Sequence, residues 1–403
     1  MSLPLYIASR QRNVTVAIAS QSAHSCLSLL RPINNTKTTR SLSTSTPSKQ
    51  KRRQISTVPT ANNWTTTRRH YSGAVPVAVP VTAEQAAANL LSRFKGETSV
   101  SRQTLDANQL CKLHLTLGKR RRGEKKKQQQ HQQPVVKIGT EVPRGHHLVY
   151  FTPTDVESEL GNDGSDASFN APWPFTRRMW AGGRMRWCGG AAQNAEACVA
   201  LKVGDEVEER TRLVDAVPKR SRDGGQMVLV NVEKEFWGPR GLALVDERSW
   251  IFRPEATGSS PAAEKALRDA VIRGPSTMED IPQDGGAYPK RQLRWSPTGL
   301  FRFSALTFNG HKIHYDPTWS TAVEGHPACV VHGPLNLINM LDYWQDHCAA
   351  GGKVREISYR AVAPIYAGET YAISAKSMET DGRWEVLVEK DGKTCMRGEI
   401  VGV

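Results

Sequence analysis

Residues 334–348 read PLNLINMLDYWQDHC, and this stretch decides the fold. Pro334 suits the first turn of a helix, because its missing N–H removes no intrahelical hydrogen bond there. The apolar side chains of this helix cover most of its circumference, at Leu335, Leu337, Ile338, Met340, Leu341 and Trp344. A helix that is apolar nearly all round is buried on all sides. The sequence therefore predicts a central, enclosed helix.

Four strand-like segments follow this helix in positions to enclose it. They cover residues 354–361, 370–378, 384–390 and 394–401. The last two are joined through Asp391-Gly392, a dipeptide that supplies the positive φ angles of a tight hairpin turn. An antiparallel sheet wrapped round one buried helix is the hot-dog architecture.

The region before the helix repeats this pattern. Its strand-like segments cover residues 198–202, 207–214, 227–236 and 242–252, and a Gly-Pro-Arg-Gly turn joins the last two. The heptapeptide LKVGDEV at 201–207 is similar to IYAGETY at 365–371, and an outgoing strand and a hairpin follow each. We therefore predict an α+β double hot-dog, with two antiparallel sheets each wrapped round a central helix.

The composition of the chain predicts where these units begin and end. Residues 254–289 are rich in Pro, Gly, Ser and Ala and are expected to form a linker. The first unit then covers residues 72–253, opening with a helix at 82–94, and the second covers 290–403. Residues 118–134 contain KRRRGEKKK and QQQHQQ without apolar periodicity, which is typical of a solvated surface insertion.

Residues 300–335 contain the most informative motif, with TFNGHKIHYD at 307–316 and Val-His-Gly at 331–333. This pattern resembles the MaoC-like, hydratase 2 superfamily. Together with RRMWAGG at 177–183, it resembles in particular the mitochondrial hydroxyacyl-thioester dehydratase type 2 group. The resemblance covers roughly residues 148–403 and implies a hot-dog enzyme that acts on acyl thioesters.

The resemblance implies roles for four residues of the second unit. His314 falls on the catalytic His of the superfamily, and Asn309 falls on its catalytic Asp. His311 matches an Asn of the family motif, and Asp316 matches its trailing Asp. Asn309 departs from the pattern, because an amide can orient a substrate or water but does not exchange a proton at neutral pH.

The implied chemistry is elimination of water from a 3-hydroxyacyl thioester. A base takes a proton from C2, an acid protonates the leaving hydroxyl, and a donor stabilises the enolate-like oxygen. A neutral His314 can serve as base and return the proton as imidazolium, while Asn309 holds the hydroxyl. If the reaction needs a second titrating group, His311 and Asp316 are the nearby candidates.

The oxyanion donor is expected at the start of the helix that begins near Pro334, where N–H groups are unpaired and the helix dipole favours negative charge. Pro334 has no N–H, so Gly333 is the predicted donor, and its missing side chain lets a thioester approach the backbone. The alternative is that Gly333 is only a helix-entry glycine.

The first unit lacks the Asn-x-His-x-x-His run, so we expect it to shape the acyl tunnel without performing chemistry. A basic loop in this unit contains the predicted substrate-binding residues Arg177, Arg178, Trp180 and Arg184. Such a loop suits the phosphate of a pantetheine arm or CoA, or an acidic acyl carrier protein. A plain solvated loop is the alternative.

The net charge of +15 is concentrated near the N-terminus. Residues 1–83 hold 11 basic residues and no acidic one, whereas the rest of the chain has 43 basic and 39 acidic residues. An acid-free leader rich in Arg, Ser and Thr is typical of a mitochondrial transit peptide, and Arg69 suits a cut that leaves Ser72 first. Residues 1–71 are thus a predicted transit peptide, with a disordered basic tail as the alternative.

Several other classes of protein and site are excluded or not implied. No run of about 18 apolar residues exists, so no membrane span is expected. The seven cysteines form no C-x-x-C pair and no Cys/His quartet at zinc spacing. Aromatic residues do not interleave the charges of the basic insertion, so no nucleic-acid partner is expected.

The sequence thus predicts an (R)-3-hydroxyacyl-thioester dehydratase of the mitochondrial matrix, acting on acyl carrier protein or CoA thioesters in fatty acid synthesis. No metal or redox cofactor is implied, because water elimination next to a thioester needs only acid/base groups and an oxyanion donor. Two alternatives stay open: a hydratase of a C4 dicarboxylic CoA such as mesaconyl-CoA, and a non-catalytic acyl-thioester-binding module. A homodimer is also left open.

Overall fold

The computed structural model describes residues 80–118, 136–188, 199–221, 224–255, 274–284, 288–378 and 382–403. All of them belong to one compact unit, residues 74–403. The predicted transit peptide, the basic insertion after Gly118 and residues 256–273 of the predicted linker lie outside the described residues. In the part described, no helix is long and apolar enough to cross a membrane.

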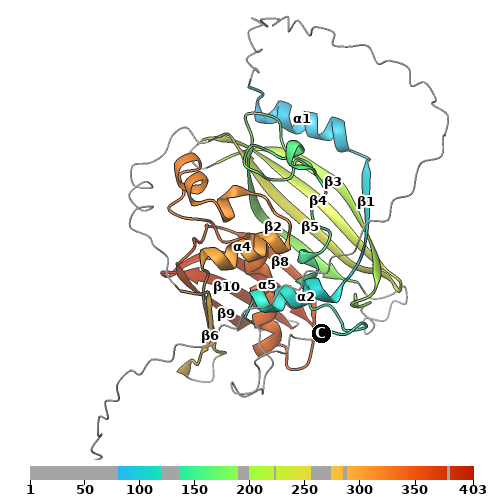
Figure 1. Ribbon diagram of the computed structural model, residues 1–403, viewed down its shortest axis with the longest axis vertical. Helices are drawn as coiled ribbons and strands as arrows, with labels where there is room; N and C mark the ends of the chain where they lie inside the picture. Colours follow the sequence, from blue (N-terminus) through green and yellow to red (C-terminus); the bar gives the residue numbers. More distant parts are fainter. Residues whose placement is uncertain are drawn as a thin grey trace, which may run out of the picture. The chain divides into compact units, whose positions relative to one another are not determined.

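The fold is a double hot-dog built on one antiparallel sheet (Figure 1). The first half supplies β1 (Thr98–Thr104), β2 (Arg177–Trp187), β3 (Glu206–Arg220), β4 (Gln226–Gly238) and β5 (Gly241–Arg253). The second half supplies β6 (Thr277–Ile281), β7 (Lys290–Arg294), β8 (Val354–Ala361), β9 (Thr370–Ser377), β10 (Arg383–Lys390) and β11 (Lys393–Gly402). The strand order is β1-β3-β4-β5-β2-β8-β11-β10-β9-β7-β6.

The two predicted sheets are therefore continuous. Strands β2 and β8 pair in antiparallel fashion from Gly182↔Arg360 to Arg186↔Glu356, which joins the sheet of one half to that of the other. The Arg184 guanidinium also donates two hydrogen bonds of 2.8 Å to Glu356 across this seam. The join removes the exposed edge that each separate sheet would have had at this point.

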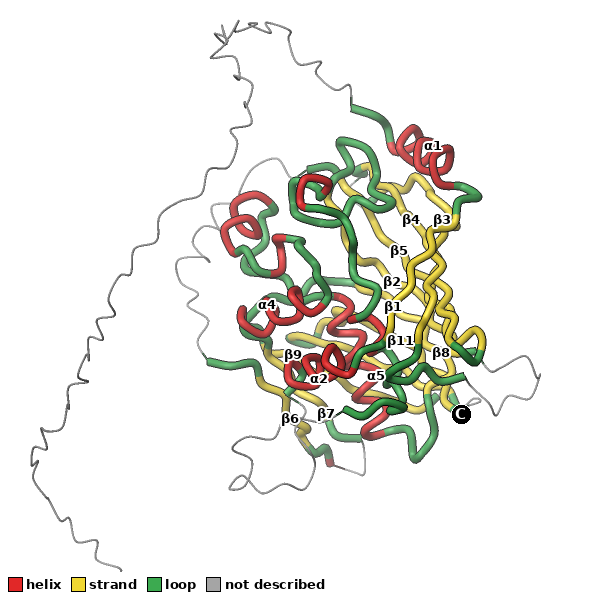
Figure 2. The backbone as a smooth tube through the Cα atoms, turned by 45° about the vertical axis from the view of Figure 1, so that its right-hand side comes forward, coloured by secondary structure: helices red, strands yellow, loops and turns green. Residues whose placement is uncertain are grey.

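Helices occupy one side of the sheet and are unequal in the two halves (Figure 2). The first half has α1 (Ala83–Phe94), α2 (Ala107–Thr116) and the short turns η1 (His146–Val149) and η2 (Glu157–Glu159). The second half has α4 (Pro297–Leu306), η4 (Lys312–His314), η5 (Trp319–Val323) and α5 (Gly333–His347). The predicted central helix is α5, whereas the first half has only short helices in this position.

The structure confirms most predicted strands and corrects three details. Strands β8 to β11 match the predicted segments within one residue at each end. Residues 199–202 form an isolated bridge from Lys202 to Glu141 instead of a strand. The expected basic loop is strand β2, and part of the predicted linker is the edge strand β6, which pairs with β7.

The similar heptapeptides adopt the same turn, as expected for an internal repeat. Gly204 and Gly368 both have positive φ, of 93° and 85°. The Lys202 N–H donates to the Asp205 carboxylate at 2.7 Å, and the Tyr366 N–H donates to Glu369 at 2.9 Å. Each turn leads directly into an outgoing strand, β3 or β9.

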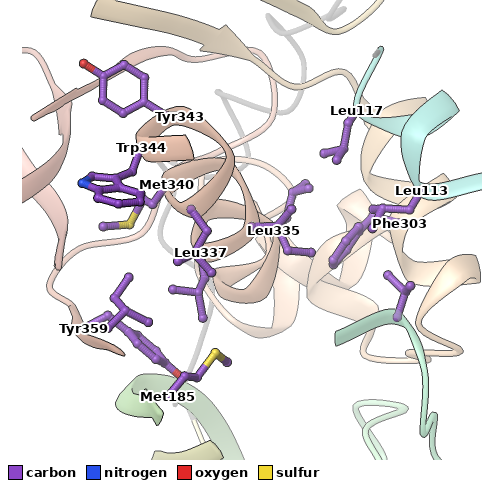
Figure 3. Packing of buried hydrophobic residues seen from close by; sticks show 14 of the residues in the cluster. Leu113, Leu117, Met185, Phe303, Leu335, Leu337, Met340, Tyr343, Trp344 and Tyr359 are labelled. Carbon is purple, nitrogen blue, oxygen red and sulfur yellow. The ribbon is translucent and has the colours of Figure 1, made fainter. Parts of the chain in front are cut away.

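The main core surrounds α5 (Figure 3). Every residue of this helix from Leu335 to Trp344 is buried. Met185 of β2 and Tyr359 of β8 pack below it, and α2 closes the core through Leu113 near Phe303 of α4. Both halves thus contribute to one core, while α1 covers β3 and β4 in a second, smaller cluster.

Among the polar pairs that join the halves, one buried pair and one exposed pair offer a comparison. His146 Nε2 of η1 lies 2.9 Å from Asp342 Oδ1 of α5, with both residues buried. On the surface, Lys353 Nζ lies 2.7 Å from Glu141 Oε2, with half of the lysine side chain exposed. A buried polar pair costs far more to break than an exposed one, because the remaining group cannot regain water.

We expect His146→Ala to lower the free energy of unfolding by about 1–3 kcal/mol, because the buried Asp342 Oδ1 loses its hydrogen bond to His146. Glu141→Ala should lower it by less than about 1 kcal/mol, as for an exposed pair. Urea denaturation of both variants measures the difference. Equal losses would show that burial of the Asp342 pair does not stabilise the contact between the halves.

Candidate active site

The predicted catalytic residues lie in the loop that leaves α4. Phe308 has a φ of 48°, so the chain turns sharply after the helix. Asn309 closes this turn, because its Oδ1 accepts a hydrogen bond of 3.0 Å from the His311 N–H. One acceptor site of the Asn309 oxygen is therefore engaged, and its amide NH₂ is available as a donor to a substrate.

His314 is held in one tautomer by the backbone. Its Nδ1 lies 2.8 Å from the Val330 carbonyl oxygen, which can only accept a hydrogen bond. Nδ1 must therefore carry the proton, and the lone pair of the neutral ring is on Nε2. Burial lowers the pKa of His314 to about 3, with a further contribution from nearby His311. His314 is thus a neutral imidazole at physiological pH, which is the form required of a base.

A second buried imidazole stacks on His314. The ring of His332 lies 3.7 Å away between centroids, at an interplanar angle of 19°. Its Nε2 lies 2.8 Å from Ser304 Oγ of α4, which fixes the ring. Burial, followed by His314, lowers the pKa of His332 well below its usual value. Two stacked imidazoles disfavour a charge on either one.

His311 lies in a different environment, between two carboxylates. Its Nε2 is 3.3 Å from Asp163 Oδ2 and 3.9 Å from Glu324 Oε1. The His311 ring meets the His314 ring edge-on, at 5.4 Å between centroids. Both His311 and Asp163 are more than nine-tenths buried. The structure thus brings two predicted residues together and adds two acids that the sequence analysis did not identify.

Asp163 reaches the site because the segment around it is hydrogen-bonded to the loop that contains His311 and His314. The Lys312 N–H donates to the Asp163 carbonyl at 2.8 Å, and Lys312 Nζ donates to the Asn162 carbonyl at 2.7 Å. Ser165 holds Asp163 Oδ1 through its N–H and hydroxyl, at 2.9 and 2.8 Å. The other oxygen, Oδ2, is left facing His311. The first half therefore supplies a charged group to the loop of the second half.

Glu324 is tied to the site from two sides. Arg177 Nε lies 3.2 Å from Glu324 Oε2, and the Trp319 indole N–H donates to Oε1 at 3.3 Å. Burial acts to raise the pKa of Glu324, but neighbouring His311 and Arg177 outweigh it and lower the pKa to about 2. Glu324 is therefore a carboxylate throughout the working range of pH.

Asp316 has a local structural role. Its Oδ1 accepts hydrogen bonds from the Thr318 and Trp319 N–H groups, at 2.9 and 3.0 Å. These bonds cap the turn that begins η5. As a candidate for the second titrating group, Asp316 is thus less favoured by the geometry than His311.

Gly333 begins α5 directly after His332, and Trp180 of β2 packs on it. A Cβ at Gly333 would lie 3.1 Å from Trp180 Cγ, closer than ordinary contact. Trp180 also stacks on Tyr359, 6.2 Å between centroids. The N-terminus of α5 is thus closely flanked by an aromatic wall, and the role of Gly333 as oxyanion donor stays a prediction.

The three predicted arginines differ in their placement. Arg177 lies at the site, where it pairs with Glu324. Arg178 makes a bidentate pair with Asp166, at 3.2 and 2.5 Å, and Arg184 spans the β2–β8 seam. The charges of Arg178 and Arg184 are thus already paired, and their role in gripping a phosphate stays a prediction that would require these pairs to open.

The trio of Asp163, His311 and Glu324 has the residue types of a cation site, with ligand atoms within 4.8 Å of one another. Two contacts oppose this use. Arg177 already neutralises Glu324, and Trp319 donates to the oxygen that faces His311. A dication here would lie close to the Arg177 charge, so the trio fits a proton-handling cluster better than a metal centre.

A family model described as hydroxyacyl-thioester dehydratase type 2 matches residues 145–367, more than half of the chain. The chain belongs to this family. The matched region contains both the Asp163 segment and the loop with His311 and His314, so the family covers the whole cluster described above.

Two curated relatives agree with this membership. The chain is 28% identical over 225 residues to mesaconyl-C(4)-CoA hydratase of Chloroflexus aurantiacus, covering 55% of this chain and 69% of that protein. It is 24% identical over 261 residues to the mitochondrial hydroxyacyl-thioester dehydratase type 2 of Schizosaccharomyces pombe, covering 61% and 80%. A solved structure of HtdX from Mycobacterium tuberculosis aligns with a TM-score of 0.47 at 14% identity, covering 76% of this chain and all of that one. The chain is a hydro-lyase of this family.

Sequence reasoning missed Asp163 and Glu324. Glu324 lies between the two quoted parts of the motif, ten residues after His314, but nothing in the spacing distinguishes it from a surface acid. Asp163 lies in LGNDGSD, where a polar, glycine-rich stretch predicts only a turn. The paired glycines Gly164 and Gly310 were the available signal, because each permits the close approach of the two segments.

We expect Gly164→Ala to reduce kcat/KM by about 10–100-fold, because a misplacement of about 1 Å in a catalytic group can cost that much. A Cβ at Gly164 would lie 2.2 Å from the Gly310 carbonyl oxygen and so push the catalytic loop away. Gly139→Ala is the matched control, with a similar positive φ of 85° but open space around the new Cβ. Similar kcat/KM values for the two variants would contradict the claim that close contact between Gly164 and Gly310 positions the loop.

The buried neutral histidines make stability depend on pH. Burial lowers the pKa of His147, His314 and His332 in the folded chain, so below pH 6.5 the unfolded chain binds more protons. Stability should therefore fall as pH drops from 7 to 5, by about 1.4 kcal/mol per pH unit for each such group. Urea denaturation at several pH values measures the slope of the unfolding free energy against pH. In His332→Asn this slope should decrease by the contribution of about one proton. An unchanged slope would contradict the neutral state of His332.

Proposed function

We propose that the enzyme eliminates water from (R)-3-hydroxyacyl thioesters to form trans-2-enoyl thioesters. The observation that carries this proposal is the fixed tautomer of His314. A buried, neutral imidazole with Nδ1–H bonded to Val330 presents a basic Nε2. This is the group required to remove a proton from C2, which is weakly acidic beside a thioester.

The start of α5 supplies the other requirement of the reaction. His314 stacks on His332, which is the residue before Gly333, so the base lies next to the helix N-terminus. Unpaired N–H groups there favour the negative charge that develops on the thioester oxygen. The Gly333 N–H is the proposed donor, and Trp180 beside it excludes water from the reacting end.

We further propose the acyl carrier protein thioesters of mitochondrial fatty acid synthesis as substrates and the mitochondrial matrix as the location. The acid-free leader supports the location, and so does the fission yeast relative, which is named as a mitochondrial protein. The basic residues of β2 are compatible with an acidic carrier or a phosphate, provided that their internal pairs open.

A hydratase of mesaconyl-C4-CoA is the second candidate, supported by the relative of higher identity. Such a substrate carries a free carboxylate, which a cation in the acyl pocket would recognise. In the part of the chain that the structure describes, Arg177 and Lys312 are cations beside the proposed catalytic loop, and both are already engaged. Arg177 pairs with Glu324, and Lys312 binds the Asn162 carbonyl and lies over the Trp319 ring. This favours uncharged acyl chains.

We expect the full-length enzyme to hydrate straight-chain 2-enoyl-CoA thioesters, and His314→Ala to reduce the rate by about 100-fold or more, as for loss of a general base. The measurement is the loss of conjugated thioester absorbance, with mesaconyl-C4-CoA and acyl carrier protein thioesters as comparison substrates. His347→Ala is the control, since His347 pairs with Asp280 at the far end of α5. Preference for mesaconyl-C4-CoA would overturn the substrate, and full activity of His314→Ala would overturn the mechanism.

A further inference from the structure

Asn309 leaves the reaction without an obvious proton donor. The leaving hydroxyl of a 3-hydroxyacyl thioester must be protonated as its C–O bond breaks. The Asn309 amide cannot do this, and its oxygen is bonded to the His311 N–H. Asp316 caps η5, and His314 takes the C2 proton. The structure must therefore supply the proton from another group.

His311 has the surroundings of such a donor. Its Nε2 and Asp163 Oδ2 are buried atoms without a hydrogen-bond partner among the described residues, and they face each other at 3.3 Å. Glu324 Oε1 approaches the same nitrogen at 3.9 Å. Opposite charges at such distances favour a charged imidazolium.

The count of charges around His311 supports the same protonation state. Asp163 and Glu324 contribute two negative charges, and Arg177 contributes one positive charge through its contact with Glu324. Protonated His311 makes this buried group neutral, whereas neutral His311 leaves one uncompensated negative charge. An uncompensated buried charge is costly, so the cluster retains the proton.

The two neighbouring imidazoles thus have opposite environments. His314 bonds a carbonyl oxygen and stacks on a neutral ring, while His311 faces two carboxylates. Pairs of titratable groups whose surroundings drive their protonation apart are the usual pattern of an acid and its matching base. Their rings meet edge-on at 5.4 Å, close enough to act on adjacent carbons of one substrate.

We propose that Asp163 and Glu324 are positioning residues that hold protonated His311 as the donor to the leaving hydroxyl. The inference rests on the proposed function and deepens it, because it makes the catalytic centre a product of both halves. With Nε2 turned to the carboxylates, Nδ1 is the nitrogen that faces substrate. Position 309 is an Asn where the family motif has an Asp. Asp163 of the first half then supplies part of the negative charge that this Asp would have contributed.

The proton and electron balance of the step is closed within the two imidazoles. The C2–H proton goes to His314 Nε2, and the C–H electron pair forms the C2=C3 double bond. The C3–O bond breaks, its electron pair stays on oxygen, and the His311 proton completes the water molecule. His314 is left charged and His311 neutral, and a proton transfer from His314 to His311 restores the resting state.

A substrate whose leaving group needs no proton tests the donor. Elimination of chloride from a 3-chloroacyl thioester requires the base but no acid. In Asp163→Asn combined with Glu324→Gln, dehydration of the 3-hydroxyacyl thioester should fall about 100-fold, the scale of general acid catalysis. Chloride elimination should stay within about threefold of wild type, since the base is intact. His314→Ala should lose both reactions.

Asp280→Asn is the matched control, because Asp280 also pairs with an arginine and a histidine, Arg291 and His347, away from the site. It should leave both reactions unchanged. Equal loss of both reactions in the double variant would overturn the proposal and indicate a purely structural role for the two acids. Unchanged dehydration in the double variant would also overturn the proposal. A wild type that dehydrates no 3-hydroxyacyl thioester would instead overturn the proposed function.

The pH profile of dehydration gives a second, independent readout. The titratable and charged groups around His311 are Asp163 and Glu324, Arg177 and His326 through Glu324, and the neighbouring imidazoles His314 and His332. Because Glu324→Gln removes one negative charge, the donor should lose its proton more readily. The alkaline limb of kcat should then move to lower pH. An unmoved limb in this variant would contradict the role of Glu324.

Discussion

The burial of α5 is the constraint on which the rest of the structure depends. A helix that is apolar on all sides cannot be covered by one half of the chain, since a sheet covers one face only. The second half wraps it with β8 to β11, and the first half adds Met185 of β2, η1 and α2. The continuous sheet and the His146–Asp342 pair both follow from this shared enclosure.

The same enclosure creates the active site. The N-terminus of α5 is drawn into the interior, together with the preceding His332 and the loop that stacks His314 on it. Removal from water keeps both rings neutral, so burial produces the form of His314 that the proposed base requires. His311 is equally buried but faces Asp163 and Glu324. The difference between the two imidazoles is therefore made by their neighbours, since the residue type is the same.

The half without the Asn-x-His-x-x-His run also contributes to the candidate site. Its segment around Asp163 accepts two hydrogen bonds from Lys312 of the proposed catalytic loop and presents a carboxylate to His311. Close contact between Gly164 and Gly310 makes this possible.

The sequence by itself determined the central helix, the strands β8 to β11, the internal repeat and the position of His314, because these depend on local periodicity and on one contiguous motif. Only the tertiary structure decided that the sheets join at β2 and β8, that the basic stretch at 177–187 is a strand with paired charges, and that Asp163 and Glu324 meet His311. Asp163 lies 148 positions before His311 along the chain, and the spacing of the two residues in the sequence does not predict that contact. Protonation states follow from burial and neighbours, and these exist only once the chain has folded.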